Sequence, residues 1–276
     1  MQKRMLLGLL CCLCLAGVAR AELRKDIEFA KADDGTSLTL DAYVPEGAGL
    51  YPAVVIVHGG GFRNGDKQTY VPPLFEPLQQ AGFVWLSINY QLYPQVKFPA
   101  PIDDVTAALR YVKANAGQYK IDLKRVVLMG ESAGGSLVSY VAVRTQSGLK
   151  LAAVVVFYGV HDWELRATHE INDKPGQSIW REFYQVTGAD LRRMREVSPI
   201  QCLKKGLPPF LLIHGTEDTQ VNYQQSVMMQ KKMQSMNLPC ELITVPGGPH
   251  GMGVFTKYPD TPVKMFAWLR QTLKLK

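Results

Sequence analysis

The feature that most constrains the fold is a succession of short, continuous apolar runs rich in β-branched residues. Continuous apolar runs are typical of strands that are buried on both faces of a sheet. Helical patterns lie between them, and this alternation indicates a mostly parallel sheet with helices on both faces. The strands expected from these runs are 53–57, 84–89, 126–129, 153–157, 210–213 and 242–245.

Two further strands are expected nearer the N-terminus, at 27–30 and 38–44. The second alternates apolar and polar residues, which is typical of an antiparallel strand near an exposed edge. The sequence therefore predicts an α/β fold built on a mostly parallel, eight-stranded sheet. The expected helices are 72–81, 102–116, 221–236 and 262–275, and one more that begins at Ser132.

The segment 159–207 interrupts the alternation of strands and helices. It is a long, charged stretch between two expected strands, and it contains several aromatic residues. Connections of this length usually carry a function or short helices of their own. We expect this segment to form a small lid over one end of the sheet. The sequence contains no internal repeat and no convincing linker. Residues 22–276 are therefore expected to form one catalytic domain with the lid as an insertion.

The N-terminus has the pattern of a cleavable secretory signal peptide. Lys3 and Arg4 precede an apolar block, 5–18, which ends in the small-residue sequence ARA at 19–21. A positive start, a short apolar stretch and an Ala-x-Ala end predict that 1–21 is removed and that the protein is secreted or periplasmic. An uncleaved anchor would need a longer apolar block. Lipid attachment at Cys11, Cys12 or Cys14 is also disfavoured, because cleavage at any of them would leave the cysteine inside the apolar run.

Charge and hydropathy exclude two classes of function. Loss of the signal, which carries Lys3, Arg4 and Arg20, lowers the formal net charge from +7 to +4. This modest excess is spread along the chain and gives no nucleic-acid-binding surface. No later apolar run is long enough for a membrane span, so stable membrane insertion is not expected.

Two cysteines, Cys202 and Cys240, remain after removal of the signal. Each lies shortly before an expected strand, and these strands should be parallel neighbours. In an oxidising compartment the two thiols would either form a disulfide or stay as buried free thiols. The sequence leaves both alternatives open, and it also leaves the oligomeric state open.

A serine lies at a tight corner in the sequence Gly130-Glu131-Ser132-Ala133-Gly134. The motif follows an expected strand and precedes a helix, the context in which a Gly-x-Ser-x-Gly turn exposes a nucleophile. The free N–H groups at the start of that helix also favour negative charge. The alternative is a glycine-rich turn whose serine only caps the helix.

The earlier strand 53–57 ends in His58 and three glycines, 59–61. Glycines let backbone N–H groups approach a ligand closely, as stabilisation of an oxyanion requires. We expect the donors to be the N–H groups of Gly60, Gly61 and Ala133, with His58 bracing the loop. Phosphate binding is less favoured, since no Gly-Lys-Ser/Thr sequence follows.

A serine hydroxyl needs a base to take its proton, and that base needs an orienting carboxylate. His250 lies in a glycine- and proline-rich loop after the last strand, whereas His214 has the sequence context of a structural residue. Asp218 and Glu217 follow the penultimate strand and are rival candidates for the acid. The two other histidines, in the expected lid, have no obvious acid partner: His161 and His169.

These motifs resemble the α/β-hydrolase superfamily, and specifically carboxylesterases with a His-Gly-Gly-Gly loop, including small bacterial feruloyl and acetyl-xylan esterases. The resemblance covers nearly all of 22–276. It implies an α/β-hydrolase fold, a triad of Ser132, Asp218 and His250, and catalysis without metal or organic cofactor. The stretches that carry it, in order, are HGGGFRNGDK, NYQLYPQVKFPAPIDD, GESAGG, PPFLLIHGTED and PGGPHG.

Some residues depart from that family's pattern. Phe62 stands where a tryptophan is often found, and Ser136 where relatives often carry histidine. These changes bear on substrate preference rather than on the reaction. Phe62 and Tyr90, together with aromatic residues of the lid, are expected to line an acyl or alcohol pocket. The alternative is that these aromatic residues only form the core of the lid. The adjacent acids Asp103 and Asp104 begin an expected helix and are interpreted as structural.

The resemblance implies a serine carboxylesterase, and the predicted signal peptide adds that it is secreted. Its expected substrates are small-molecule or carbohydrate-linked esters, with acetyl or feruloyl esters of carbohydrate among the candidates, and the sequence leaves the natural ester and its acyl length open. A serine peptidase of the prolyl-oligopeptidase type shares fold and triad, but such enzymes usually carry a propeller domain for which this chain has no room. A non-enzymatic binding protein on a hydrolase scaffold is the second alternative. Such proteins commonly lose the nucleophile or the base, whereas this sequence retains both.

Overall fold

The computed structural model of the protein describes residues 21–144, 147–170, 179–186 and 191–275, with the backbone alone at 169, 170 and 179. Residues 1–20 of the predicted signal peptide and part of the predicted lid therefore lie outside the described residues.

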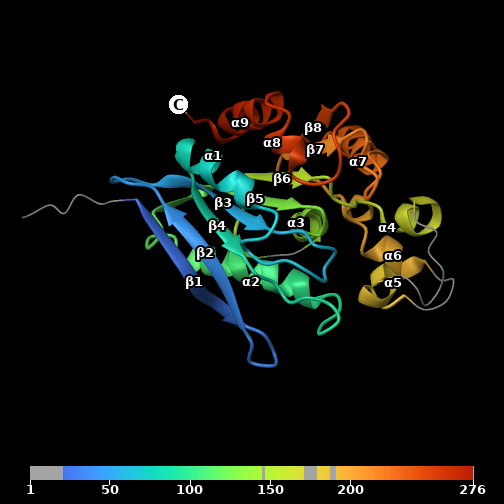
Figure 1. The fold of residues 1–276 in the computed structure, drawn as a ribbon, viewed down its shortest axis with the longest axis horizontal. Coiled ribbons are helices and arrows are strands. Elements are labelled where there is room, and N and C mark those ends of the chain that lie inside the picture. The colour runs from blue at the N-terminus through green and yellow to red at the C-terminus, as the bar shows by residue number, and fades with distance from the viewer. Residues whose placement is uncertain (1–20, 145–146, 171–178, 187–190, 276) are drawn as a thin grey trace, which may run out of the picture.

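The described strands form one eight-stranded sheet in the order β1-β2-β4-β3-β5-β6-β7-β8 (Figure 1). β1 pairs antiparallel with β2, and β2 with β4, while every other neighbouring pair is parallel. The predicted mostly parallel sheet is therefore confirmed. The strands are β1 (Glu22–Lys31), β2 (Ser37–Val44), β3 (Tyr51–Val57), β4 (Val84–Ile88), β5 (Ile121–Glu131), β6 (Ala153–Phe157), β7 (Phe210–Gly215) and β8 (Cys240–Val245).

The continuous apolar runs are explained by two cores, one on each face of the sheet. Successive side chains of a strand point to opposite faces, so Val54 and Ile56 of β3 join one core while Val55 and Val57 join the other. Helices α1, α8 and α9 cover the first core, and α2, α3 and α7 cover the second; Figure 1 shows α1 and α9 on the opposite side of the sheet from α2. These helices are α1 (Phe75–Gln80), α2 (Ala100–Ala114), α3 (Ala133–Arg144), α7 (Gln224–Ser235), α8 (Gly253–Thr256) and α9 (Asp260–Leu273).

Several boundaries differ from the predicted ones, because backbone pairing extends strands through polar residues. β5 begins at Ile121, which pairs with Tyr51 of β3, and not at 126 as its apolar run suggested. β1 is a mostly exposed strand that runs well beyond 27–30, with two irregularities in its register against β2. The added residues of both strands are mostly polar, so no continuous apolar run signalled them.

The described residues between β6 and β7 form three short α-helices, a π-helix (Arg166–Glu170) and a 3-10 helix (Pro199–Cys202). The three α-helices group together to one side of the sheet (Figure 1). The side chain of Gln225 in α7 anchors the start of this segment, since its Oε1 accepts the N–H groups of His161 at 2.9 Å and Asp162 at 2.7 Å. Ser198 Oγ accepts the N–H of Trp163 at 2.8 Å. The three helices are α4 (Trp163–Leu165), α5 (Ile179–Phe183) and α6 (Arg192–Glu196).

Cys202 and Cys240 are both free thiols, so of the two alternatives left open by the sequence the structure has the unbridged one. Cys240 begins β8 and pairs with Phe210, and burial raises the pKa of its thiol to about 12. Cys202 lies near Arg144 at the end of α3, where Nη1 is 3.4 Å from the sulfur. Among the described residues, no helix has the length and apolar character needed to cross a membrane.

The first turn of α3 lies in direct contact with the end of β3, and Gly134 makes this contact possible. A Cβ atom on Gly134 would lie 2.3 Å from the carbonyl oxygens of Val57 and His58. Atoms cannot approach so closely, and the obstacles are backbone atoms that no side-chain rotation can move.

We therefore expect Gly134→Ala to lower the free energy of unfolding by about 1–3 kcal/mol, the usual cost of inserting a group into a packed contact. Gly117→Ala is the matched control, because nothing lies within 4 Å of a Cβ at that exposed position. Urea denaturation of both variants measures the difference. Equal stabilities would contradict the close contact between α3 and β3.

Candidate active site

Ser132 lies at the sharp turn between β5 and α3, in a backbone conformation that side-chain-bearing residues rarely adopt. Its φ is 51°, in the left-handed region, which costs about 1–3 kcal/mol and persists only where the surroundings enforce it. The N–H of Ser132 donates to the carbonyl of Phe157 at 2.9 Å, and its carbonyl accepts the N–H of Ser136 at 3.0 Å. The turn is crowded as well, because a Cβ on Gly130 would lie 2.5 Å from the carbonyl oxygen of Gly134.

The structure brings Ser132, His250 and Asp218 into one hydrogen-bonded chain. His250 Nε2 lies 2.9 Å from Ser132 Oγ, and His250 Nδ1 lies 2.7 Å from Asp218 Oδ2. Asp218 follows β7 and His250 follows β8, so both side chains reach the serine from the carboxyl edge of the sheet. This edge is where open parallel sheets place their sites.

The carboxylate of Asp218 has no exposed surface, and donors surround it. Its Oδ1 accepts the N–H groups of Gln220 and Val221, each at 2.8 Å, and its Oδ2 also lies 3.2 Å from Nε2 of His214. Burial by itself would raise the pKa of Asp218, but the hydrogen bonds from His214, His250 and Val221 outweigh burial and lower it. The carboxylate is therefore ionised at neutral pH, as an orienting acid must be.

His214 was interpreted from its sequence context as a structural residue. It is fully buried beside the hydrogen-bonded series of Ser132, His250 and Asp218. Its Nε2 lies 2.9 Å from the carbonyl of Val221, and its Nδ1 lies 2.7 Å from Ser226 Oγ. Since Nε2 faces only acceptors, that nitrogen carries a hydrogen. His161 is fully buried and is not among the described residues that line the cavity of Ser132, and the side chain of His169 lies outside the described residues. Glu217, the rival candidate for the acid, is exposed, and it is Asp218 that pairs with His250.

The glycine loop faces the serine from the end of β3. Gly60 and Gly61 have φ values of 96° and 64°, and a Cβ on Gly60 would lie 1.9 Å from the carbonyl oxygen of Asn64. Glycine is thus required here for a left-handed backbone and for a close backbone approach. Gly60, Gly61 and Ala133 all line the cavity that contains Ser132.

Three buried side chains hold this loop from behind. His58 Nδ1 lies 2.8 Å from the carbonyl of Gly59, and the Tyr90 hydroxyl donates to the carbonyls of His58 and Gly59, both at 3.1 Å. Glu131 Oε1 accepts the N–H of Gly59 at 2.5 Å. Burial lowers the pKa of His58 to about 4, so its imidazole is neutral and suited to bracing. Burial also raises the pKa of Glu131.

The predicted placement of Phe62 and Tyr90 in the pocket wall is corrected by the structure. Phe62 is completely buried and stacks on Phe183 with ring centroids 4.4 Å apart, in a cluster of aromatic rings from the segment between β6 and β7. Tyr90 is 4% exposed and stacks on His58 behind the glycine loop. Both residues support the wall rather than forming it.

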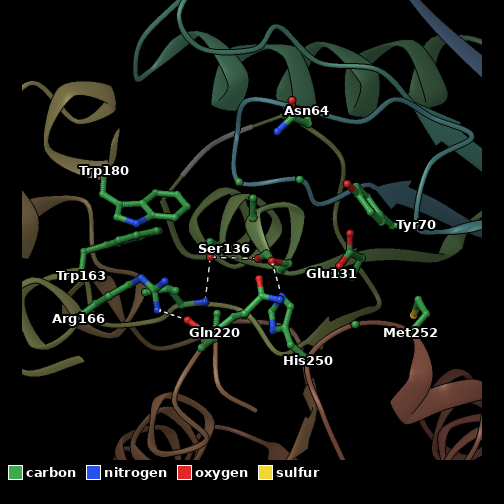
Figure 2. A pocket seen from close by; sticks show the side chains of 17 residues that line it. Asn64, Tyr70, Glu131, Ser136, Trp163, Arg166, Trp180, Gln220, His250 and Met252 are labelled. Atoms are coloured by element: carbon green, nitrogen blue, oxygen red, sulfur yellow. Dashed lines mark hydrogen bonds between the residues drawn. The ribbon is translucent and has the colours of Figure 1, made fainter. Parts of the chain in front are cut away.

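The cavity that contains Ser132 has a volume of about 630 Å³. Figure 2 shows that different groups of side chains line its two sides. Trp163, Trp180 and Arg166 of the lid segment lie on one side. Tyr70, Glu131 and Met252 lie on the other, with His250 between the two groups. The remaining lining residues include Asn64, Ser136, Val160, Gln220, Val221 and Gly251. Sequence reasoning did not name Arg166, and it named Glu131 only as a member of the serine motif, because nothing in the local sequence signals that these two side chains line one cavity.

Other acids have structural surroundings. Asp104 is buried in α2, where its carboxylate accepts the backbone N–H of Gln91 at 2.8 Å and the side-chain amide of Gln91 at 3.0 Å. Burial raises the pKa of Asp104 to about 6. In the described part of the chain, no group of three or more His, Cys, Asp or Glu side chains is arranged to hold a metal ion.

The BD-FAE family model matches residues 40–233 of the chain. Among curated proteins, the chain is 28% identical over 218 residues to esterase LipC of Mycobacterium tuberculosis, covering 72% of this chain and 53% of that protein. It is 31% identical over 189 residues to the probable carboxylic ester hydrolase LipM of the same organism, covering 64% and 44%. The chain thus spans about half the length of these relatives.

Solved structures resemble the protein over most of its length. A truncated form of a carbohydrate esterase from gut microbiota has a TM-score of 0.82 and 26% identity, covering 94% of this chain and 99% of that one. A bifunctional GH43-CE protein of Bacteroides eggerthii has a TM-score of 0.81 and 27% identity, covering 91% and 35%. Since the family model spans most of the chain and the fold agrees with these structures, the chain belongs to the BD-FAE family of α/β-hydrolases.

Proposed function

We propose that this protein is a serine carboxylesterase that hydrolyses carboxylic esters through an acyl-enzyme on Ser132. The observation that carries the proposal is the hydrogen-bonded chain from Asp218 through His250 to Ser132, at a cavity that the glycine loop also lines. The likeness to esterases in sequence supports the same reaction class.

In the proposed mechanism, His250 Nε2 takes the proton of Ser132 as the serine oxygen attacks the ester carbonyl. Asp218 holds the imidazole in the tautomer with hydrogen on Nδ1 and stabilises the imidazolium that forms. The carbonyl oxygen becomes an oxyanion, which accepts hydrogen bonds from the N–H groups of Gly60, Gly61 and Ala133. Each such donor typically stabilises the transition state by about 3–4 kcal/mol.

Collapse of this intermediate breaks the bond to the alcohol, which leaves with the proton held on His250. A water molecule then gives a proton to His250 and attacks the acyl-enzyme carbonyl. The second tetrahedral intermediate releases the carboxylic acid and returns the proton to Ser132. The cycle consumes one ester and one water molecule, releases the alcohol and the carboxylic acid, and returns Ser132 and His250 to their starting protonation states.

For the substrate, we propose small-molecule or carbohydrate-linked esters, with acetyl and feruloyl esters as the leading classes. The structural likeness to the truncated carbohydrate esterase from gut microbiota supports this choice. The aromatic side of the cavity, formed by Trp163 and Trp180, offers flat surfaces for a sugar or an aromatic ring.

We expect Ser132→Ala to lower kcat for p-nitrophenyl acetate by roughly 10³-fold or more, because the nucleophile is lost. Ser139→Ala is the matched control: this buried serine lies on the same helix and donates to the carbonyl of Gly135 at 2.8 Å, outside the cavity. Steady-state rates of both variants test the role of Ser132. Full activity of Ser132→Ala would contradict the role of Ser132 as the nucleophile. If the wild-type protein hydrolysed only aminoacyl p-nitroanilides and no esters, the proposal of a carboxylesterase would be wrong.

We expect Asp218→Asn to lower kcat by roughly 10⁴-fold, since an amide cannot hold the imidazole in the required tautomer. Glu217→Gln removes the neighbouring exposed acid and should keep the wild-type rate. Kinetics of the two variants decide between the acids. A large loss in Glu217→Gln with activity retained in Asp218→Asn would reverse the assignment.

We further propose that the protein is exported after cleavage of residues 1–21, as the charge and apolar pattern of this segment suggests. Expression in a bacterium with a periplasm should yield a mature protein whose N-terminal residue is Glu22. N-terminal sequencing and intact mass of the periplasmic and cytoplasmic fractions provide the measurement. A protein found only in the cytoplasm with residues 1–21 attached would contradict this.

A further inference from the structure

We propose that Tyr70 determines which alcohol part of an ester the enzyme prefers, by forming a hydrogen bond with a substrate hydroxyl next to the ester group. This role rests on the proposed function, because it assumes that Ser132 attacks an ester bound in the same cavity. It deepens that function by naming the substrate class as esters of vicinal diols, such as sugars and other polyols.

Tyr70 presents a free hydroxyl at the cavity. The residue lines the cavity that contains Ser132 and is 50% exposed. Its hydroxyl makes no hydrogen bond with any residue that the structure describes. Figure 2 shows the ring extending from the edge of the cavity toward its middle, with the hydroxyl at the inner end. A phenolic hydroxyl both donates and accepts hydrogen bonds, so it can pair with a substrate hydroxyl in either direction.

The backbone of Tyr70 has a strained conformation. Its φ is 67°, in the left-handed region, where a bulky residue is a genuine outlier. The N–H of Val71 donates to the carbonyl of Thr69 at 2.8 Å, so Tyr70 is the central residue of a γ-turn. A γ-turn with a positive φ at its centre is rare and strained. Strain of this kind clusters at functional sites, where the surrounding structure fixes a residue in advance.

Residues on both sides of Tyr70 enforce this turn. Before it, Asp66 Oδ1 accepts the N–H of Gln68 at 2.8 Å and the hydroxyl of Thr69 at 2.7 Å. After it, Val71 is completely buried in the core that α1 covers. The turn therefore holds Tyr70 at the cavity before any substrate binds.

The ring of Tyr70 packs against the glycine loop. A Cβ on Gly60 and a Cβ on Gly65 would each lie 3.3 Å from Cε2 of Tyr70. Cε2 is bonded to the carbon that carries the hydroxyl, so the hydroxyl lies close to the loop proposed to bind the ester carbonyl. In an ester of a vicinal diol, the free hydroxyl also lies close to the ester carbonyl. The position of Tyr70 therefore suits a hydroxyl on the carbon next to the esterified one.

The chemistry of the reaction assigns Tyr70 to the alcohol part of the ester. The leaving oxygen must receive its proton from His250, so the alcohol part lies toward His250 and the acyl part points away from it. Met252 follows His250 by two residues and lies on the same side of the cavity as Tyr70, whereas Trp163 and Trp180 lie on the other side (Figure 2). The alcohol part therefore lies beside Tyr70 and Met252, and the acyl part beside the two tryptophans.

The test compares two acetates that differ in one hydroxyl of the alcohol: trans-2-hydroxycyclohexyl acetate and cyclohexyl acetate. Acyl migration in the first ester regenerates the same compound, so it does not disturb the measurement. Each kcat/KM is divided by the rate constant for hydroxide-catalysed hydrolysis of the same ester, which removes the difference in intrinsic reactivity. We expect the corrected wild-type values to favour the hydroxy ester by roughly 3- to 10-fold, the range for one neutral hydrogen bond.

Tyr70→Phe should reduce this preference to near one through a loss on the hydroxy ester, because phenylalanine keeps the ring and lacks only the hydroxyl. Tyr43→Phe is the matched control. Tyr43 is also partly exposed and stacks on Trp85 with ring centroids 6.2 Å apart, and it is not among the described residues that line the cavity. This control should keep the wild-type preference.

A second pair of esters, ethyl 3-hydroxybutanoate and ethyl butanoate, places the hydroxyl on the acyl part instead. We expect Tyr70→Phe to leave the wild-type ratio of this pair unchanged, because the acyl part lies on the side of the tryptophans. If the variant changed the ratio of this pair and not that of the cyclohexyl pair, the assignment of Tyr70 to the alcohol part would be wrong.

Equal corrected wild-type values for the cyclohexyl pair would overturn the role of Tyr70, and so would a preference that survives in Tyr70→Phe. A loss of equal size on both cyclohexyl esters would also overturn it, because that result indicates a structural role in the loop. If Tyr70→Phe fails to fold, Tyr70→Leu replaces it with the same expected results. If the wild-type protein hydrolyses neither these esters nor p-nitrophenyl acetate, the proposed function itself fails.

Discussion

The close approach of helix α3 to the end of strand β3 is the contact on which the site depends. Gly134 allows the helix to touch the carbonyl groups of Val57 and His58. The glycine loop continues from the same end of β3, so this contact places the start of α3 beside Gly60 and Gly61. The serine turn and the proposed oxyanion donors therefore come together through backbone packing.

A second constraint is the hydrogen bonding of one buried carboxylate. A carboxylate without partners would be costly to bury, but Asp218 accepts from two backbone N–H groups and lies within reach of two histidines. These donors keep the group ionised and fix its orientation. His250 thus meets a rigid acceptor on one side and the hydroxyl of Ser132 on the other. The preorganisation that the proposed mechanism needs is already present without substrate.

Much of the fold and the site could be predicted, because both follow from local signals. Continuous apolar runs indicated the parallel strands, and the glycines around Ser132 indicated a turn with no room for side chains. Asp218 and His250 follow consecutive strands, and parallel strands end at one edge, so their convergence was a reasonable expectation. The acid itself was chosen by family resemblance, since Glu217 is adjacent in sequence and local pattern does not distinguish the two.

The predictions that failed concern the direction of side chains and contacts between distant segments. Phe62 follows the glycine loop directly, yet its backbone is left-handed, with φ of 61°, and its ring stacks on Phe183 of α5 instead of facing the cavity. Tyr90 points at the back of the loop instead of into the cavity. Glu131 was known only as the variable residue of the serine motif, but the pairing of β3 with β5 makes it a brace for Gly59.

The sequence by itself determined the parallel α/β sheet, the position of the serine turn and the small group of residues from which the triad candidates come. These features depend on hydrophobic periodicity and on backbone conformations that only glycine tolerates, and both can be read locally. Only the tertiary structure decided which side chains form the cavity wall, including Arg166 beside Trp180. That outcome depends on how the lid segment packs over the strand ends, and such packing arises from contacts between residues far apart in the chain.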